Sequence, residues 1–314
     1  MRKRGLIFFW SIIFVMVLLS TGVWAADYPT RAITIIVPYS AGGSTDTVTR
    51  IFTQIFSTHL KQPVVVENKP GAGSFVGTKE LIKANPDGYT LGVCSNALVG
   101  FHHSMANIGP LWKEVEPIGL FNDDPVAMGV SMKLGIGTFK ELIDFGKKNP
   151  KKLNRGVNPG TVNALYAARL MKLAGVLTNE VPFPGGGEAN VALAGGHIDM
   201  YFDTVRVYQP LVTAQKVKIL GISSERRAPY FPEIPTFKEQ GADITWGSWN
   251  GIFAPKKTPP EIILALEKAI ERTVNDKKYV EMMEKNTSVI RYLGRQAYLR
   301  LIEEEDKVYQ EVAR

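Results

Sequence analysis

The chain alternates short runs of β-branched apolar residues with longer segments of helical periodicity, and this alternation constrains the fold more than any other feature. The run AITIIV at 32–37 predicts a buried strand, and apolar residues recur at helical spacing from Ser44 to Leu60. PVVVEN at 63–68 and YTLGVC at 89–94 predict the next strands. Such alternation is typical of parallel sheets with crossover helices, so we predict an α/β fold.

A second series of the same kind begins with TFKELIDFGKK, which opens with the capping-box pair Thr138 and Glu141. Short predicted strands at 153–157, 180–183, 198–202 and 217–222 then alternate with helical segments that open on glycine or small residues. The chain is long enough to build two apolar cores. We therefore predict two α/β lobes.

The aromatic segment WGSWNGIFAP predicts a further strand after these two series. We expect Trp246 and Trp249 to lie in the core or between the lobes rather than against a ligand. A helix should follow, with Thr258 as its cap, Pro259 in its first turn and Glu261 completing a capping box. The C-terminal tail predicts an amphipathic surface helix.

The N-terminal segment 1–25 has the pattern of a secretory signal peptide. Three basic residues precede an apolar run from Leu6 to Leu19, and small residues lead to Ala25, where we expect cleavage. An uncleaved membrane anchor is the alternative, but the run is shorter than the roughly 20 residues of a membrane span. No cysteine follows the run for lipid attachment. We therefore expect an exported, periplasmic protein.

Composition narrows the classes of partner. Removal of the signal peptide lowers the formal net charge from +7 to +4, so the mature chain is only mildly basic. The sequence has no block of Lys and Arg interleaved with aromatic residues, which argues against nucleic-acid binding. Cys94 is the only cysteine and cannot form an intramolecular disulfide, so stability must come from apolar cores.

The turn YSAGGSTD at 39–46 joins the first predicted strand to the first predicted helix. Gly42 and Gly43 leave the backbone open to a ligand, and the first N–H groups of a helix, with its dipole, attract an anion. The short side-chain donors of this turn are Ser40, Ser44 and Thr45. Asp46 is expected to cap the helix or hold the loop. The turn therefore predicts a carboxylate site, with a plain strand-to-helix connection as the alternative.

Similar segments recur at the ends of other predicted strands. CSNA at 94–97, VNPGT at 157–161, PFPGGGE at 182–188 and FDT at 202–204 all place small or amide residues there. Ligands of open α/β sheets bind outside the carboxyl ends of the strands. Several such ends facing one another would form a ligand cleft.

Six motifs follow one another across nearly all of the mature chain. They are YPTRAITIIVPYSAGGSTD, QPVVVENKPGAGSFVGT, NPDGYTL, LAGGHIDMYFD, ERR leading to FPEIPTFKEQG, and SWNGIFAPKKTP. In this order they resemble the Bug receptors, the extracytoplasmic solute-binding proteins of tripartite tricarboxylate transporters. The resemblance implies a two-lobed periplasmic-binding-protein (Venus flytrap) fold that closes on a small organic acid and passes it to membrane permease subunits.

The resemblance also implies how the chain is divided and how the ligand is held. We expect a discontinuous first lobe at 26–122 and 227–314 and a second lobe at 123–226, with crossings near 122–125 and 220–227. Family members typically hold the carboxylate through backbone amides, hydroxyl groups and ordered water rather than an arginine clamp. Carried over to this sequence, the expected ligand contacts are Tyr39, Ser40, Gly43, Ser44, Asp46, Ser95, Asn96, Asn158, Gly160, Thr161, Asn163, Pro184, Gly185, Asp203 and Thr204.

Two segments depart from the usual pattern of that family. VNPGTVNAL carries amides where many relatives have more serines, and FDTVRVY places Arg206 where uncharged residues are usual. Arg206 either pairs with a second carboxylate of the ligand or is a surface charge on a helix, of which the second interpretation is favoured. These departures leave the identity of the ligand open.

Other features predict no metal and no cofactor. GAGSFVG at 71–77 imitates a dinucleotide fingerprint, but no acidic residue ends the following strand, so we interpret it as a structural turn. His102 and His103 have no cluster of Cys or carboxylate ligands near them in the sequence. We interpret them as surface or packing residues.

Two other classes of protein could share such a sequence. An exported hydrolase would need an activated nucleophile, yet the chain has no G-x-S-x-G motif and no histidine near its loop serines. We therefore predict that the protein is not an enzyme. A sensory protein that docks on a membrane kinase would have the same fold and ligand, and it stays open as an alternative.

Overall fold

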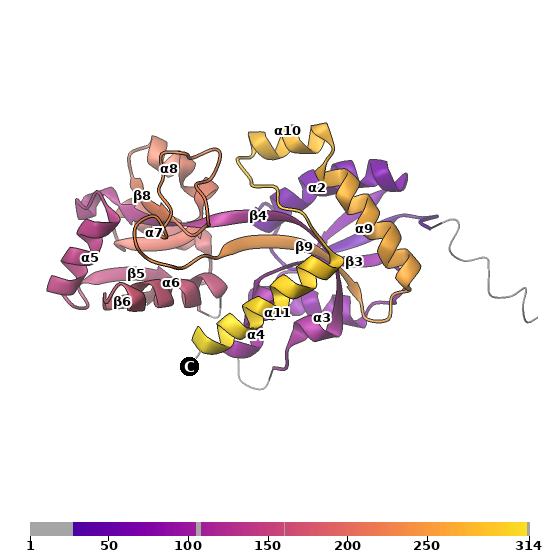
Figure 1. Ribbon diagram of the computed structural model, residues 1–314, viewed down its shortest axis with the longest axis horizontal. Coiled ribbons are helices and arrows are strands. Elements are labelled where there is room, and N and C mark those ends of the chain that lie inside the picture. The colour runs from indigo at the N-terminus through magenta and orange to yellow at the C-terminus, as the bar shows by residue number, and fades with distance from the viewer. Residues whose placement is uncertain (1–27, 105–107, 160, 313–314) are drawn as a thin grey trace, which may run out of the picture.

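Two long strands, β4 (Val115–Ser131) and β9 (Gly247–Pro255), run side by side through the middle of the molecule and join its two lobes (Figure 1). The computed structural model describes residues 28–104, 108–159 and 161–312. The predicted signal peptide at 1–25 lies outside the described residues. Both connecting strands are almost entirely buried, so the junction between the lobes is part of the core.

The first lobe is built on strands in the order β2-β1-β3-β9-β4. The first three are parallel to one another, and β9 is antiparallel to both of its neighbours. The strands that complete this sheet are β1 (Ile33–Val37), β2 (Val64–Asn68), β3 (Thr90–Ser95) and β10 (Leu293–Gly294). Its helices are α2 (Ser44–Leu60), α3 (Phe75–Lys83), α4 (Ala97–Ser104), α9 (Pro260–Val274), α10 (Lys277–Lys285) and α11 (Arg295–Val312).

The second lobe continues the order as β4-β7-β5-β6, with β8 also paired to β4. β5 is parallel to β6 and β7, whereas β4 is antiparallel to β7 and β8. Its strands are β5 (Leu153–Val157), β6 (Thr178–Pro182), β7 (Met200–Thr204) and β8 (Val217–Ile222), and its helices are α5 (Phe139–Lys148), α6 (Val162–Leu173), α7 (Gly186–Gly195) and α8 (Gln209–Thr213). The predicted α/β class is confirmed.

Aromatic residues hold the first lobe together on the face covered by α2, α9 and α10. Phe52 of α2 stacks on Phe121 of β4 with ring centroids 4.4 Å apart, and Tyr279 of α10 meets Phe52 edge-on at 6.1 Å. Burial of such rings removes large apolar areas from water, which is the main stabilising contribution in a core of this kind. The spacing of apolar residues along α2, read from the sequence, therefore places the buried face correctly.

Helix α11 lies along the junction and contacts both lobes (Figure 1). It packs against α4 in the first lobe and against α6 in the second, where Tyr166 meets Tyr309 with centroids 5.6 Å apart. Trp246 stacks on Tyr166 at 5.1 Å and is buried, and Trp249 is also buried. Both tryptophans are therefore core residues, as predicted.

The two predicted capping boxes have different outcomes. Thr138 and Glu141 form the box at the start of α5, with both reciprocal hydrogen bonds present. The box at Thr258 was wrongly predicted, because α9 starts after Pro259 and the Thr258 hydroxyl donates to the carbonyl of Pro255. Proline disfavours the helical region for the residue before it, and Pro259, which precedes Pro260, has an extended ψ of 138°. The helix therefore begins at Pro260, one residue later than predicted.

The segment interpreted as a structural turn forms the 3-10 helix η1 (Ala72–Ser74) between β2 and α3. Gly71 precedes it with a φ of 142°, a conformation that only glycine adopts without strain. Three further 3-10 helices are η2 (Leu111–Glu114), η3 (Met132–Leu134) and η4 (Val205–Tyr208). The last of these follows β7 directly and carries Arg206.

Candidate functional site

The N-terminus of α2, where the sequence predicts a carboxylate site, is not capped by any side chain. Gly43 occupies its N-cap position with φ −72° and ψ 173°. The first N–H groups of a 17-residue helix therefore have no side-chain acceptor, and they lie at the positive end of its dipole. Gly42 makes the turn with a φ of 78°, so the requirement for glycine falls on Gly42 rather than Gly43.

Asp46 holds this turn from inside. Its carboxylate is buried and accepts hydrogen bonds from the Gly42 backbone N–H at 2.8 Å, Arg50 Nε at 3.0 Å and Asn68 Nδ2 at 2.8 Å. Burial alone would raise the pKa of Asp46, but these hydrogen bonds and the Arg50 charge hold it below its usual range. An ionised Asp46 fixes the loop from behind. Its expected contact with ligand stays a prediction.

Other predicted contacts of the first lobe bind one another. The Tyr39 and Ser95 hydroxyl groups lie 2.6 Å apart and join the end of β1 to the end of β3. Asn96 donates through Nδ2 to the carbonyl of Gly247 at 2.6 Å, which ties this strand end to β9. Ser40 is exposed. The fold therefore brings the predicted first-lobe residues to one edge of the sheet.

The predicted contacts in the second lobe start at the end of β5. Asn158 donates to the carbonyl of Phe183 at 3.0 Å and accepts from the Tyr201 hydroxyl, and Thr161 caps α6 by accepting from the Ala164 N–H at 3.3 Å. A cavity of about 10 Å³, room for about one water molecule, is lined by Arg155, Gly156, Val157, Asn158, Thr161, Asn163, Ala164, Ala167, Tyr201 and Phe202. Gly160 lies outside the described residues.

The remaining predicted contacts lie at the start of α7 and the end of β7. Gly185 is the N-cap of α7, and Pro184 is exposed beside it. Asp203 accepts from Asn190 Nδ2 at 2.8 Å and from the Thr204 N–H at 2.7 Å, and burial raises its pKa above the usual range. Thr204 is buried, and its hydroxyl oxygen has no partner among the described residues. Each contact of this set with ligand stays a prediction.

Arg206 connects the two sets. Its side chain is only 12% exposed, its Nε lies 3.3 Å from Oδ2 of Asp124, and its Nη2 donates to the Ser44 hydroxyl oxygen. The favoured interpretation of Arg206 as a surface charge was therefore wrong. Since Ser44 opens α2 and Arg206 lies on η4, this contact brings the two predicted halves of the site to hydrogen-bond distance.

Three residues that support the candidate site were missed by the sequence analysis. Asn68 at the end of β2 holds both Asp46 and the carbonyl of Tyr39, at 2.8 and 3.0 Å. Asp124 anchors Arg206, and Arg155 is buried with its Nη1 unpartnered among the described residues. Asn68 and Arg155 are an amide and a charged residue inside predicted strands, which was the available signal, whereas Asp124 lies in β4, which was not predicted as a strand.

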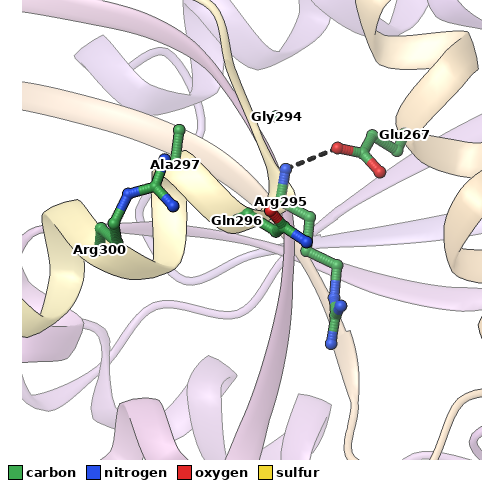
Figure 2. Close-up of a pocket in the computed structure, with 6 residues that line it drawn as sticks. All are labelled: Glu267, Gly294, Arg295, Gln296, Ala297 and Arg300. Atoms are coloured by element: carbon green, nitrogen blue, oxygen red, sulfur yellow. Dashed lines mark hydrogen bonds between the residues drawn. The ribbon is translucent and has the colours of Figure 1, made fainter.

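A larger surface pocket lies elsewhere. Its volume is about 440 Å³, and it is lined by Glu267, Gly294, Arg295, Gln296, Ala297 and Arg300 at the start of α11 (Figure 2). Glu267 already accepts a hydrogen bond from the Arg295 backbone N–H at 2.7 Å, so a carboxylate of the protein occupies this helix N-terminus. This pocket contains none of the predicted contacts, and we do not assign the ligand to it.

No helix in 28–104, 108–159 or 161–312 combines the length and the apolar character that a membrane span requires. Within the same ranges, no three His, Cys, Asp or Glu side chains come together as a metal site. His103 instead lies 2.8 Å from Asp306 of α11 through its Nε2.

Comparison with known proteins identifies the family. The model of the tripartite tricarboxylate transporter family receptor, TctC, matches residues 48–313. The chain belongs to this family. BugT of Bordetella pertussis is 31% identical over 262 residues, which are 82% of this chain and 80% of BugT.

Solved structures agree with this membership. A TctC solute-binding protein from Polaromonas matches with a TM-score of 0.76 and 30% identity, over 91% of this chain and 98% of that one. MatC from Rhodopseudomonas palustris with bound malate matches with a TM-score of 0.79 and 28% identity, over 91% of this chain and all of that one. The resemblance to Bug receptors and the two-lobed fold are thereby confirmed, and the family consists of solute-binding receptors rather than enzymes.

Proposed function

We propose that this TctC-family protein is exported to the periplasm, captures a small organic acid between its lobes and delivers it to the membrane permease subunits of a tripartite tricarboxylate transporter. Family membership supports the transport role, and the malate bound by MatC supports a carboxylate as the ligand. The contact between Ser44 and Arg206 carries the proposal, because it joins an uncapped helix N-terminus in one lobe to a cation in the other.

The ligand's carboxylate is proposed to bind at the start of α2. The Gly43 and Ser44 region offers backbone N–H groups and a hydroxyl, and Asp46 and Asn68 hold the loop in place from behind. A carboxylate accepts such hydrogen bonds more strongly than a neutral group does. The predicted second-lobe residues at 158–163, 184–185 and 203–204 would then contact the rest of the ligand.

Lobe boundaries form part of the same proposal. Strand β4 supports a first crossing near 122–125, and the second, predicted at 220–227, stays a prediction. Packing favours a later second crossing at Gly247, because the Trp246 N–H donates to the carbonyl of Ser223 at 2.9 Å and Phe231 and Ile234 are buried in the core of the second lobe. Two connecting strands between lobes permit hinge closure on a ligand.

A thermal-shift screen tests the binding role. We expect at least one of lactate, malate, citrate, benzoate and glutamate to raise the melting temperature, since a ligand at a hundredfold excess over its Kd stabilises the folded state by about 2.7 kcal/mol. The acid should be recovered chemically unchanged after incubation. Absence of any shift across mono-, di- and tricarboxylates would overturn the proposal.

Ser44→Ala tests the place of binding. Removal of the Ser44 hydroxyl should weaken binding of the acid that gives the largest thermal shift by about 1.5–3 kcal/mol, the contribution of one hydrogen bond to a charged group. Ser57→Ala is the matched control, because Ser57 lies in the same helix and its hydroxyl donates only to the Gln54 carbonyl. Equal affinity of the two variants would move the site away from α2.

Mass spectrometry of the exported protein should find Ala26 at the N-terminus.

A further inference from the structure

We infer that Arg206 binds the carboxylate of the ligand directly, from the second lobe, opposite the N-terminus of α2. The inference rests on the proposed function and assigns a role to a residue that the family pattern does not explain. It makes this receptor hold its ligand with a formal charge in addition to backbone dipoles.

The hydrogen bonds of Arg206 leave most of its donors free. A guanidinium group has five N–H donors. Nε is held by Asp124 and one donor of Nη2 by Ser44, and among the described residues the other donors have no acceptor. The side chain is only 12% exposed, but no Arg206 nitrogen is among the fully buried unpartnered atoms of the described residues, so this free edge remains open to a ligand. A carboxylate accepts two N–H bonds from a guanidinium at once, which matches this unused edge.

The position of the charge also favours an anion. Arg206 donates to the first residue of α2, so a cation lies at the positive end of a helix dipole. Such an arrangement is unfavourable unless a negative group lies between the two. Binding of a carboxylate to both Arg206 and the α2 N–H groups would remove this repulsion.

The acidic groups around Arg206 are already committed to other partners. Asp124 is held by the Val289 N–H at 2.8 Å and by Asn122 Nδ2 at 3.1 Å, so it remains at the Nε edge. Asp203 is bound by Asn190 and its own neighbouring backbone N–H. Asp46 faces Arg50 on the far side of the loop. Asp124 therefore orients Arg206 through Nε, and none of the three carboxylates occupies its Nη edge.

Ligand binding would then exchange one partner for another. In the structure, Ser44 Oγ accepts from Arg206. When a carboxylate oxygen takes that place, the Ser44 hydroxyl is free to donate to the same carboxylate. The ligand therefore replaces a direct contact between the lobes with a stronger, charge-assisted one.

Arg206→Gln tests the inference, measured by calorimetry with the acid that gives the largest thermal shift with the wild-type protein. We expect a loss of affinity of about 10- to 100-fold, with partial recovery in Arg206→Lys. The affinity of the wild-type protein should fall as salt is added, and that of Arg206→Gln should fall less. Arg227→Gln is the control, because Arg227 pairs with Glu239 at the surface of the second lobe.

A purely structural role for Arg206 predicts a different result. The double variant Arg206→Gln with Asp124→Asn removes both charges of the buried pair, so it avoids leaving Asp124 unpaired. Recovery of wild-type affinity in this folded double variant would overturn the inference. A persistent loss supports it. If Ser44→Ala weakens binding and Arg206→Gln does not, the proposed function stands and the inference fails; if no acid binds the wild-type protein, both fail.

Discussion

Strand β4 carries two neighbouring aspartates, Asp123 and Asp124, whose side chains point to opposite faces of the strand and meet opposite kinds of environment. Asp124 pairs with Arg206, which is itself largely buried. Asp123 faces α11, where its partner Arg291 is 44% exposed and its Oδ1 has no hydrogen-bond partner among the described residues. Asp124 is therefore paired with a largely buried arginine, whereas Asp123 is paired with an arginine that is partly in solvent.

A second carboxylate sharpens the difference. Glu305 of α11 accepts hydrogen bonds from Trp249 Nε1 at 2.9 Å and from the Tyr309 hydroxyl at 3.2 Å, close to Asp123. Burial raises the pKa of Glu305 to about 8, and burial raises the pKa of Asp123 to about 6 against the opposing charge of Arg291. Burial also raises the pKa of Asp124, but the charge of Arg206 opposes it. The α11 side should respond to pH near neutrality.

The largest effect is expected on the paired side. Asp124→Ala leaves Arg206 without its counter-charge and the Val289 N–H without its acceptor. Removal of one partner of a buried ion pair typically costs about 3–5 kcal/mol of unfolding free energy. Chemical denaturation of the wild-type protein and the variant measures this loss directly.

Two further variants control for this effect. Asp124→Asn keeps an oxygen for the Val289 N–H and should cost less than the alanine variant. Asp144→Ala breaks an exposed pair with Lys140, and such surface pairs contribute little. An Asp124→Ala variant as stable as Asp144→Ala would show that the Asp124 and Arg206 pair does not stabilise the junction.

Much of this fold follows from local sequence signals. The apolar spacing of 44–60 predicted α2, and the buried run 32–37 predicted β1, because these patterns depend only on which face each element buries. The false cap at Thr258 has a local cause too. Two successive prolines move the helix start, and the hydroxyl finds the Pro255 carbonyl instead.

Only part of the candidate site could be predicted from local sequence. The turn at 39–46 was recognised in the sequence because glycine and hydroxyl residues directly before a helix are typical of an anion-binding helix N-terminus, and these residues are adjacent in the chain. Arg206 was judged from its immediate neighbours in the sequence and was placed wrongly at the surface. Its partners, Ser44 and Asp124, lie 162 and 82 residues away in the chain. Pairings over such separations depend on how the lobes pack, which no local pattern records.

The pH dependence of stability tests the side of β4 that faces α11, where Glu305 lies. Glu305 has a higher pKa in the folded protein than in the unfolded chain, so its contribution is most favourable below pH 4.5 and is lost as the pH rises through about 8. Glu305→Gln removes this titration. Relative to the wild-type protein, the variant should gain about 2 kcal/mol of unfolding free energy as the pH rises from about 5 to about 8. This gain is smaller than the whole pKa shift at about 1.4 kcal/mol per pKa unit would give, because Glu305 is partly exposed.

Denaturation curves at several pH values measure this gain. Asp306→Asn is not a suitable control, because Asp306 of α11 lies 2.8 Å from His103 Nε2 of α4. Glu303→Gln is preferable, since Glu303 is an exposed residue of α11 two positions away. A stability difference between Glu305→Gln and the wild-type protein that does not change with pH would contradict the raised pKa.

The smallest effect is expected from Tyr309→Phe, which removes a single hydroxyl from the Glu305 cluster. The ring of Tyr309 is fully buried, and phenylalanine keeps its packing against Tyr166. Loss of the 3.2 Å hydrogen bond should cost about 0.5–1.5 kcal/mol when Glu305 is ionised, because the bond favours the charged carboxylate. The cost should therefore be larger at pH 9 than at pH 6. The pKa of Glu305 should rise further in the variant, which moves the pH-dependent loss of stability to higher pH. A cost that is equal at both pH values would show that the hydroxyl does not distinguish the two forms of Glu305, and the contrast between the two faces of β4 would then rest on Asp123 alone.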